Sequence, residues 1–388
     1  MKLLLLSVEF PPGPGGLGSL AYQVASQLAR LGWQIVVATK QSFASRQEIE
    51  SFNRSLSFEL HRFTFTGPAI LEGADRLLKA AKLIRRERPD AILAIGRQAV
   101  WVGAAAGALT GIPVIAAGAG TEFTWANPLE RALSKWSFGR AGKVICISRY
   151  TKGLALAFGI AESRIAVILP AADAHRFDSG LETAKLRENL GLKNSKVILT
   201  VGQVSERKAQ DVLIQALPQI KEVVPESVYL IVGLPSKRER MERLADALGV
   251  SECIKFTGVV SREELPLYYN LADVFVLVSR SVAGGEVEGF GISVLEAALC
   301  GKPAVVSGET GLEEAVIPGE TGLVVPQSDP EATARAVVQL LLDDELRANL
   351  GIQAREHALQ SATWELRGLE YEAVVKTILP DVQEIPAL

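Results

Sequence analysis

The chain has 388 residues, of which 48 % are hydrophobic and 22 % are charged. This composition excludes a disordered or collagen-like chain, and at roughly 100–200 residues per domain the length predicts two domains. The three cysteines form no close pair in the sequence, which excludes a disulfide scaffold and indicates a reducing compartment, here expected to be the cytoplasm. No pair of histidines or cysteines has the spacing of a zinc site, so we expect no resident metal.

The charge is distributed unevenly along the chain, although its sum is only -3. Residues 1–177 carry 21 Lys and Arg against 12 Asp and Glu, whereas residues 178–388 carry 20 against 32. A basic half next to an acidic half predicts that the first half faces an anionic partner, such as a phosphorylated acceptor or a phospholipid surface. Ordinary variation of surface charge is the alternative.

Short apolar runs alternate with amphipathic segments in the first half. The sequence predicts a helix at 19–31 and strands at 2–9, 33–39, 91–95, 112–117 and 142–148. The stretch from 99 to 120 has no charged residue and is long enough to span a membrane, but Gly111 and Pro113 interrupt it. We therefore interpret it as a buried helix over about 98–109 followed by a buried strand over about 113–117.

A further predicted helix, over 74–90, combines a basic and an apolar face. Its basic residues stand at 76, 79, 82, 85, 86 and 88, beside the apolar Leu77, Leu78 and Ile84. Such a helix can lie on an anionic membrane surface. The alternative, which is more common, is a helix that packs on its own sheet and keeps its cations in water.

The second half repeats the alternation of strands and helices. Its predicted strands are at 196–202, 228–233, 254–258, 274–279 and 302–307. We therefore expect the α/β class, with two Rossmann-like, doubly wound parallel-sheet domains facing across a cleft. The expected boundaries are 1–170 for the N-terminal domain, 171–363 for the C-terminal domain, and about 364–388 for a last helix that crosses back to the first domain.

The loop after the first strand is rich in glycine, and Gly13, Gly15 and Gly18 spell the GxGxxG pattern of dinucleotide sites. A nicotinamide site also needs an acid at the end of the second strand, where this chain has Lys40. NAD(P) is therefore disfavoured. Glycine amides and the dipole of a helix beginning at Ser19 instead predict a site for another anion.

A second loop, between the strand that ends at Gly202 and a helix that begins near residue 209, contains Arg207 and Lys208. Cations in this position bind phosphate or diphosphate well, because the helix N-terminus adds a favourable dipole. The alternative is a pair of solvated cations at the edge of a helix.

The third constellation lies at 279–308, where Glu288 and Glu296 are separated by seven residues. If a helix begins about Ile292, Glu288 lies in the loop before it and Glu296 near its second turn. Both carboxylates can then accept hydrogen bonds from the hydroxyls of a sugar or ribose. The alternative is two surface acids around a capped helix, but the apolar neighbours of Glu296 argue against exposure.

These residues carry a family resemblance. VEGFGISVLEAALCGKPAVV resembles the Glu-x7-Glu signature of retaining glycosyltransferases of the GT-B fold, family 4 (glycosyltransferase group 1). Around GGEVEGFG the chain looks closest to the phosphatidylinositol mannoside mannosyltransferase type. The loop 11–18 and the stretch SERKAQDVLIQAL resemble the glycine loop and the phosphate loop of that family.

The resemblance implies a role for individual residues. Lys208, with Arg207, would contact the donor diphosphate, Glu288 the sugar hydroxyls, and Glu296 the ribose. The implied donor site consists of Gly202, Gln203, Lys208, Glu288, Gly289, Phe290, Gly291, Ile292 and Glu296, and the implied phosphate and acceptor loops of Gly15, Gly16, Ala119, Thr121 and Glu122. The chain has no Asp-x-Asp motif, which agrees with chemistry that needs neither metal nor other cofactor.

The chain departs from the family pattern at two positions. Gln203 stands where the family usually has an arginine five residues before the lysine, and Ala119 stands where it commonly has a histidine that lines the sugar pocket. Arg207 can replace the missing arginine from the same loop. Thr121 and Glu122 are the nearest polar candidates beside Ala119.

The function that the resemblance implies is retaining transfer of a hexose in polysaccharide biosynthesis. The donor would be a nucleotide diphosphate sugar, UDP-glucose-like or GDP-mannose-like, and the acceptor a hydroxyl of a glycan or lipid-linked glycan. We expect a cytoplasmic enzyme that binds no nucleic acid and meets the inner face of the membrane peripherally. The alternatives are a catalytically silent nucleotide-sugar binding subunit, which the two departures favour, and a sugar-nucleotide epimerase on the same fold.

Overall fold

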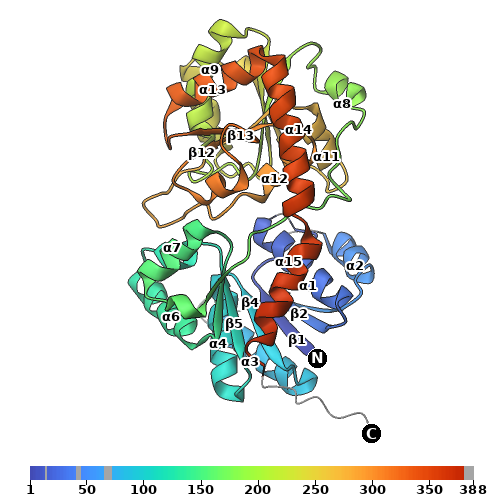
Figure 1. Cartoon of the computed structure of the whole chain (residues 1–388), viewed down its shortest axis with the longest axis vertical. Coiled ribbons are helices and arrows are strands. Elements are labelled where there is room, and N and C mark those ends of the chain that lie inside the picture. The colour runs from blue at the N-terminus through green and yellow to red at the C-terminus, as the bar shows by residue number, and fades with distance from the viewer. Residues whose placement is uncertain (14, 41–44, 65–71, 380–388) are drawn as a thin grey trace. The chain divides into compact units, whose positions relative to one another are not determined.

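The computed structural model of the chain describes residues 1–13, 15–40, 45–64 and 72–379. It divides into two compact units, one formed by Met1–Pro170 with the chain from Trp364 onward, and one formed by Ala171–Thr363. Each unit is built on one parallel β-sheet with helices packed around it (Figure 1). The predicted α/β class with two doubly wound parallel sheets is confirmed.

The N-terminal unit contains a seven-stranded sheet within the described residues. From edge to edge its strands are β3 (Glu59–Phe63), β2 (Gln34–Lys40), β1 (Lys2–Ser7), β4 (Ala91–Ile95), β5 (Val114–Gly118), β6 (Lys143–Cys146) and β7 (Ile165–Val167). The strand order reverses between β1 and β4, which are hydrogen-bonded neighbours. In open α/β sheets ligands bind beyond the carboxyl ends of the strands at such a reversal.

Burial explains the composition of these strands. The run Leu3–Leu6 is almost completely buried, because β1 lies in the middle of a sheet that is covered on both faces. The covering helices are α1 (Gly16–Arg30), α2 (Arg46–Arg54), α3 (Glu72–Glu87), α4 (Arg97–Thr110), α5 (Thr121–Thr124), α6 (Pro128–Arg140) and α7 (Arg149–Phe158).

The charge-free stretch forms the helix and strand expected of it, α4 and β5. Its glycines let the helix lie close to the sheet: a Cβ on Gly103 would stand 3.0 Å from the Cβ of Ala94, and a Cβ on Gly107 would collide with the side chain of Val114. This stretch is therefore apolar because it is packed against β4 and β5. Within the described residues, no helix is both long and apolar enough to cross a bilayer.

The C-terminal unit contains a six-stranded parallel sheet within the described residues. Its strands, from edge to edge, are β10 (Ile254–Gly258), β9 (Ser227–Val232), β8 (Lys196–Val201), β11 (Val274–Leu277), β12 (Ala304–Ser307) and β13 (Gly322–Val325). Its helices are α8 (Ala184–Asn189), α9 (Gln210–Val223), α10 (Arg238–Ala247), α11 (Leu265–Leu271), α12 (Ile292–Leu299), α13 (Pro330–Leu342) and α14 (Asp344–Ser361). Here the order reverses between β8 and β11.

The last helix, α15 (Trp364–Lys376), packs against α1 of the N-terminal unit (Figure 1). Contacts with Trp33 and Gln27 hold α15 in place. The indole Nε1 of Trp33 donates a hydrogen bond to Glu372 at 3.1 Å, and Gly368 lies so close to Gln27 that a Cβ would stand 2.7 Å from it. The helix ends at Lys376, earlier than the expected helix over about 364–388, and residues 380–388 lie outside the described residues.

Candidate active site

The loops after β8 and β11 lie side by side because the two strands are neighbours at the reversal of the sheet. A backbone hydrogen bond joins them, from Arg280 N–H to the carbonyl oxygen of Arg207, at 2.9 Å. This brings Arg207 and Lys208, from the first loop, next to Glu288 of the second. The sequence placed these residues in separate motifs, and the structure brings them into one cluster.

Glu288 is at the centre of this cluster. Its Oε2 atom accepts contacts from Lys208 Nζ at 2.7 Å, Arg207 Nη1 at 2.5 Å and Ser279 Oγ at 3.1 Å. Glu288 is only 7 % exposed, and burial by itself would raise the pKa of its carboxyl. The positive charges of Arg207 and Lys208 outweigh burial and lower this pKa to about 2. Glu288 is therefore an ionised carboxylate at neutral pH.

Lys208 lies next to Ala209, the N-cap residue of α9. Ala209 has a left-handed backbone, with φ of 52°, which turns the chain from the loop into the helix at Gln210. Burial lowers the pKa of Lys208, while the charge of Glu288 acts in the opposite direction. Two cations around one carboxylate leave a net positive charge beside a helix N-terminus, which is an arrangement suited to phosphate groups.

Glu288 is followed by the glycine turn that begins α12. Gly291 has φ of 95° and is the N-cap of the helix, which begins at Ile292 as predicted. Phe290 is buried, and the turn is held from outside because Gly311 N–H donates to the carbonyl oxygen of Glu288 at 2.9 Å. The amides from Gly289 to Ile292 therefore lie in and beside the first turn of α12, where they can bind an anion.

Glu296 lies in the second turn of α12 and accepts a hydrogen bond from the hydroxyl of Tyr269 at 2.5 Å. Burial raises the pKa of Glu296, although the positive charges of Arg176 and Arg262 act against it. The two arginines are linked, since Arg176 Nη2 donates to the carbonyl oxygen of Arg262 at 2.7 Å. Glu296 is thus a partly buried acid with a phenol and two cations around it.

The side chain of Gln203 is not part of the Glu288 cluster. The side-chain Nε2 of Gln203 donates to Ser236 Oγ at 2.9 Å on the exposed side of the loop, and the backbone carbonyl oxygen of Gln203 accepts a hydrogen bond from Gln210 Nε2 at 3.1 Å. Gly202, with φ of 155°, lies beneath the stem of Lys208: a Cβ there would stand 3.4 Å from Lys208 Cε. The second cation on Glu288 is therefore Arg207.

In the N-terminal unit, the glycine loop after β1 leads into α1. The prediction that this helix begins at Ser19 is wrong: α1 begins at Gly16, and Gly15, with φ of 147°, is its N-cap. Ser19 N–H donates to Gly15 O at 3.1 Å inside the first turn. The positive φ of Gly15 is a backbone conformation that residues with a side chain rarely adopt, so glycine is favoured here. Pro14 lies outside the described residues.

Glu122 turns inward rather than toward solvent. It is 4 % exposed, and its Oε2 accepts the backbone N–H groups of Ala119 at 2.9 Å and Gly120 at 3.0 Å. Burial raises the pKa of this carboxyl, with the backbone hydrogen bonds opposing the rise. Its role in the structure is to hold the turn at 119–120, and the half-buried Thr121 opens the short helix α5 beside it.

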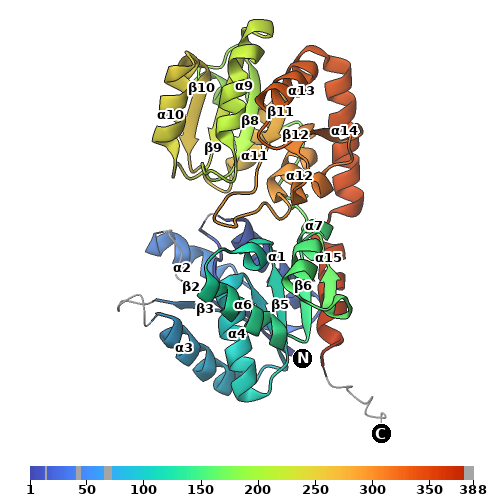
Figure 2. The same ribbon diagram turned by 90° about the vertical axis from the view of Figure 1, so that its left-hand side faces the viewer.

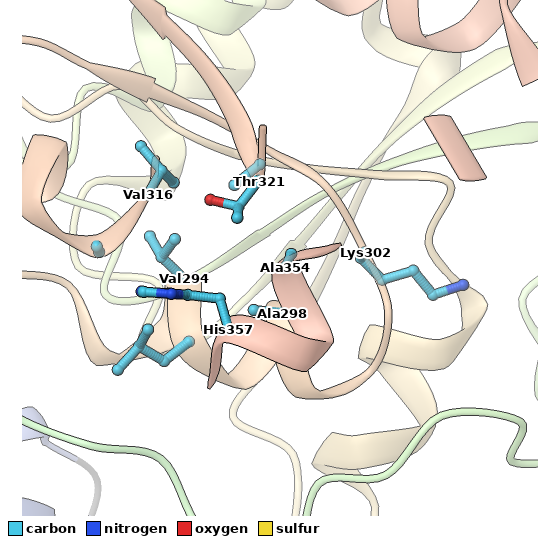
Figure 3. A pocket seen from close by; sticks show the side chains of 10 residues that line it. Val294, Ala298, Lys302, Val316, Thr321, Ala354 and His357 are labelled. Atoms are coloured by element: carbon cyan, nitrogen blue, oxygen red, sulfur yellow. The ribbon is translucent and has the colours of Figure 1, made fainter. Parts of the chain in front are cut away.

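Two hollows in the structure lie outside the predicted donor residues. One, with a volume of about 10 Å³, has room for roughly one water molecule and lies between α12 and α14. Figure 3 shows His357 and Val294 lining it, while Lys302 extends away. It contains none of the predicted site residues.

The other hollow lies at the carboxyl ends of β1, β2 and β3 in the N-terminal unit. Lys40 and Arg76 line it, and both form ion pairs with Glu72, at 3.3 and 2.5 Å. Thr39 is buried there, and among the described residues its hydroxyl has no hydrogen-bond partner. Sequence reasoning missed this group because its cations come from segments far apart in the chain.

Sequence reasoning also missed Ser279, Tyr269 and Arg280, which support the two glutamates and the loop of Lys208. The only available signal was the position of Ser279 and Arg280 just after an apolar strand. Among the described residues, no group of three or more His, Cys, Asp or Glu is arranged to hold a metal ion.

The fold and these loops define a class, the glycosyltransferases of the GT-B fold. The structure is similar to that of Anabaena HepE in complex with UDP and glucose, with a TM-score of 0.84, 21 % identity, and coverage of 97 % of this chain and 100 % of that one. It is also similar to sucrose-phosphate synthase from Thermosynechococcus elongatus, with a TM-score of 0.80, 22 % identity, and coverage of 97 % and 98 %. At these identities the likeness shows the fold.

The sequence comparisons show the family. The Glycosyltransferase Family 4 model matches residues 14–176, and the model named Glycosyl transferases group 1 matches residues 182–357. The chain is 32 % identical over 381 residues to a GDP-mannose-dependent alpha-(1-6)-phosphatidylinositol monomannoside mannosyltransferase of Mycolicibacterium smegmatis, covering 94 % of this chain and 96 % of the relative. It is 35 % identical over 236 residues to a D-inositol 3-phosphate glycosyltransferase of Corynebacterium urealyticum, covering 58 % and 54 %. The chain belongs to glycosyltransferase family 4, as the sequence resemblance predicted.

Proposed function

We propose that the protein transfers a hexose from a nucleoside diphosphate sugar to a hydroxyl of a lipid-linked glycan, with retention of anomeric configuration. GDP-mannose is the favoured donor, because four relatives that match over nearly the whole chain are named as GDP-mannose-dependent mannosyltransferases. An acceptor that carries phosphate is supported by the hollow with Lys40 and Arg76. The reaction is expected in the cytoplasm, where buried free cysteines such as Cys146 stay reduced.

The cluster of Glu288 with Lys208 and Arg207 carries the proposal. The donor diphosphate binds Lys208, Arg207 and the amides at the start of α12, in place of the contacts that the two cations make with Glu288. Glu288 then accepts hydrogen bonds from the sugar hydroxyls. Glu296, on the next turn, receives the ribose hydroxyls in exchange for Tyr269 or beside it. Lys208, Arg207 and Glu288 already stand together beyond β8 and β11, so the cluster is assembled before the donor binds.

The proposed chemistry takes place on one face of the sugar. The bond from the anomeric carbon to the diphosphate oxygen breaks, and the bond to the acceptor oxygen forms on the same face. The acceptor proton passes to the leaving phosphate oxygen. Lys208 and Arg207 stabilise the charge that develops on the diphosphate, which is the task a metal ion performs in other transferases.

The test replaces Lys208 by alanine and measures transfer from labelled GDP-mannose to a phosphatidylinositol mannoside. We expect a loss of about 10²–10³-fold in kcat, which is typical for removal of one preorganised charge at an oxyanion. Lys196→Ala is the matched control, since Lys196 lies in the same unit in an exposed ion pair with Asp344. Equal rates for the two variants contradict the proposal.

Two further readouts belong to the same assay. Full activity in a chelator is expected if the cations replace a metal, and an α-anomeric product, identified by NMR, is expected for retention. A silent nucleotide-sugar binding subunit is the second candidate, favoured by Gln203 and Ala119 at the two positions that depart from the family pattern. Saturable donor binding without turnover identifies the silent subunit, and an isomerised free donor identifies an epimerase.

A further inference from the structure

Tyr269 of α11 lies completely inside the C-terminal unit. The residue is 0 % exposed, and α11 packs against α12 (Figure 2). Its ring meets Phe177 edge-on, with 5.5 Å between the ring centroids, and the tilted ring of Phe275 at 5.8 Å. Phe177 lies in the segment before α8 and Phe275 in β11, so segments far apart in the chain fix this ring and with it the direction of its hydroxyl.

The partner of this hydroxyl is a carboxylate. Tyr269 donates to Glu296 Oε2 at 2.5 Å. Burial and the negative charge of Glu296 raise the pKa of Tyr269 well above its usual value, so the phenol keeps its proton and remains a donor. In return, the hydrogen bond opposes the rise that burial causes in the pKa of Glu296. The phenol therefore favours the ionised form of Glu296.

Glu296 keeps one carboxylate oxygen for another partner. Oε2 accepts from Tyr269, whereas Oε1 has no hydrogen-bond partner among the residues that the structure describes. Glu296 is also partly exposed, although the phenol bound to it is completely buried. A ligand that arrives from solvent can therefore bind Glu296 without displacing Tyr269.

Other charged and titratable groups surround Glu296 without replacing this hydrogen bond. Besides Tyr269, they are Asp173, Arg176, Lys208, Arg262 and Cys300. The charges of the two arginines lower the pKa of Glu296, and that of the aspartate raises it. Burial raises the pKa of the Cys300 thiol to about 12, so this group is uncharged at neutral pH. The arginines thus act on Glu296 through their charge, and Tyr269 fixes its position.

We propose that Tyr269 is a positioning residue for the ribose of the donor: it holds Glu296 by Oε2, so that Oε1 accepts the ribose hydroxyls. The inference rests on the proposed function, in which Glu296 receives the ribose, and adds that the phenol stays in place when the donor binds. An ionised carboxylate that is already oriented loses little freedom on accepting these two donors. A donor without the ribose hydroxyls leaves Oε1 without a partner, which costs affinity.

A hydrogen bond that served packing alone would need no charge at this place. Tyr229 of β9 is also 0 % exposed, and its hydroxyl donates to the neutral Thr200 Oγ1 at 2.9 Å. Glu296 instead sets a carboxylate beside the phenol, although burial raises its pKa. A carboxylate kept at such a cost indicates a binding group that is held ready for its ligand.

The test compares Tyr269→Phe with the matched control Tyr229→Phe, because each variant removes one buried hydroxyl and keeps the ring. Titration calorimetry measures the affinity for GDP-mannose and for its analogue with 2′,3′-dideoxyribose. We expect Tyr269→Phe to bind GDP-mannose about tenfold more weakly and the analogue as wild type does, so that the preference for the ribose form shrinks. Tyr229→Phe should keep both affinities.

Two further measurements separate positioning from a general effect on the fold. Once Glu296→Gln has removed the charge, adding Tyr269→Phe should lower donor affinity no further. The pH below which GDP-mannose binding weakens should also be higher in Tyr269→Phe than in wild type, because loss of the hydrogen bond raises the pKa of Glu296.

The outcomes distinguish this inference from the proposed function. Equal GDP-mannose affinity in wild type and Tyr269→Phe overturns the positioning role and leaves the proposed function standing. An equal loss for GDP-mannose and the analogue overturns it as well, because the hydroxyl then acts on the fold and not on the ribose. Wild type that binds both ligands equally tightly overturns it without any variant. Wild type that binds neither contradicts the proposed function, and the inference falls with it.

Discussion

The guanidinium of Arg280 donates to both carboxylate oxygens of Asp211, at 2.6 and 2.8 Å. Asp211 lies in the first turn of α9, and the backbone N–H of Arg280 donates to Arg207 at the same time. Arg280, in the loop after β11, therefore holds both ends of the segment 207–211, which carries Lys208. Neither member of the pair contacts Glu288, so the pair acts on the site by positioning it.

Replacing Arg280 by lysine should loosen this segment without removing a charge. Both contacts to Asp211 come from one nitrogen, Arg280 Nη2, and the ammonium of lysine stands one bond nearer to the backbone than this nitrogen. We therefore expect donor affinity to fall about tenfold and stability by about 1–3 kcal/mol. Titration calorimetry with GDP-mannose and urea unfolding measure the two effects. Arg238→Lys is the control, since its i,i+4 pair with Glu242 is exposed and both quantities should stay near wild type. Unchanged donor affinity in Arg280→Lys contradicts the positioning role.

The glycine turn before α12 should be sensitive to a single methyl group placed outside it. A Cβ on Gly311 would collide with the carbonyl group of Gly289 and stand 2.8 Å from Phe290 N. Gly311→Ala must displace the amides at the start of α12, so we expect loss of donor binding and a clear drop in melting temperature. Thermal unfolding with and without donor measures both.

Gly284 provides the matched control for this substitution. Gly284 lies in the loop after β11 that also contains the glycine turn, its φ is not positive, and a Cβ there would meet nothing within 4 Å. Gly284→Ala should retain donor binding and the wild-type melting temperature. If Gly284→Ala loses donor binding to the same extent, the loop as a whole is intolerant and the argument from Gly311 fails.

The central strands of both sheets could be predicted because their burial leaves a strong signal. Of these, β4 has the predicted bounds, and β1 and β8 differ from theirs only at one end. The edge strand β10, which is only partly buried, also has the predicted bounds. The strands β3, β7 and β13 were not predicted. β3 and β7 are edge strands at the two ends of one sheet and β13 is an edge strand of the other, and all three are short and only partly buried. Charged residues interrupt β3, and the apolar runs within β7 and β13 are only three residues long, which is too short to predict a strand.

The candidate site was predictable in its residue types and not in its contacts. The spacing of Glu288 and Glu296, with glycines between, is visible in the sequence, and so are the cations before α9. Arg207 and Lys208 both contact the carboxylate of Glu288, which is 81 residues from Arg207 in the sequence. This contact depends on the pairing of β8 with β11, which residue types do not reveal. The inward turn of Glu122 likewise depends on a backbone conformation that residue type alone does not determine.

Glu122 should make the protein less stable as pH rises. Burial raises the pKa of its carboxyl in the folded state above the usual 4.5, so ionisation favours the unfolded chain. Relative to Glu122→Gln, wild type should therefore lose stability as pH rises from about 4.5 toward neutrality. Urea unfolding of both proteins across this range is the measurement. A constant difference between them contradicts the expectation.

Glu288 should show the opposite dependence. Despite its burial, the charges of Arg207 and Lys208 lower the pKa of its carboxyl from 4.5 to about 2 in the folded state. Its contribution to stability is therefore fully present above about pH 4.5 and is lost as pH falls toward 2. At 1.36 kcal/mol per unit, the difference between wild type and Glu288→Gln should shrink by about 3 kcal/mol over that range.

The two glutamates serve as controls for each other in this experiment, because each is buried and each is replaced by its own amide. The free energy of unfolding of wild type minus that of Glu288→Gln should grow as pH rises. The same difference between wild type and Glu122→Gln should decline. If both differences move in the same direction, the dominant effect is general to buried carboxyls. The ion pairs of Arg207 and Lys208 with Glu288 would then be too weak to offset its burial, and Glu288 would not be the preformed anion that the proposed donor site requires.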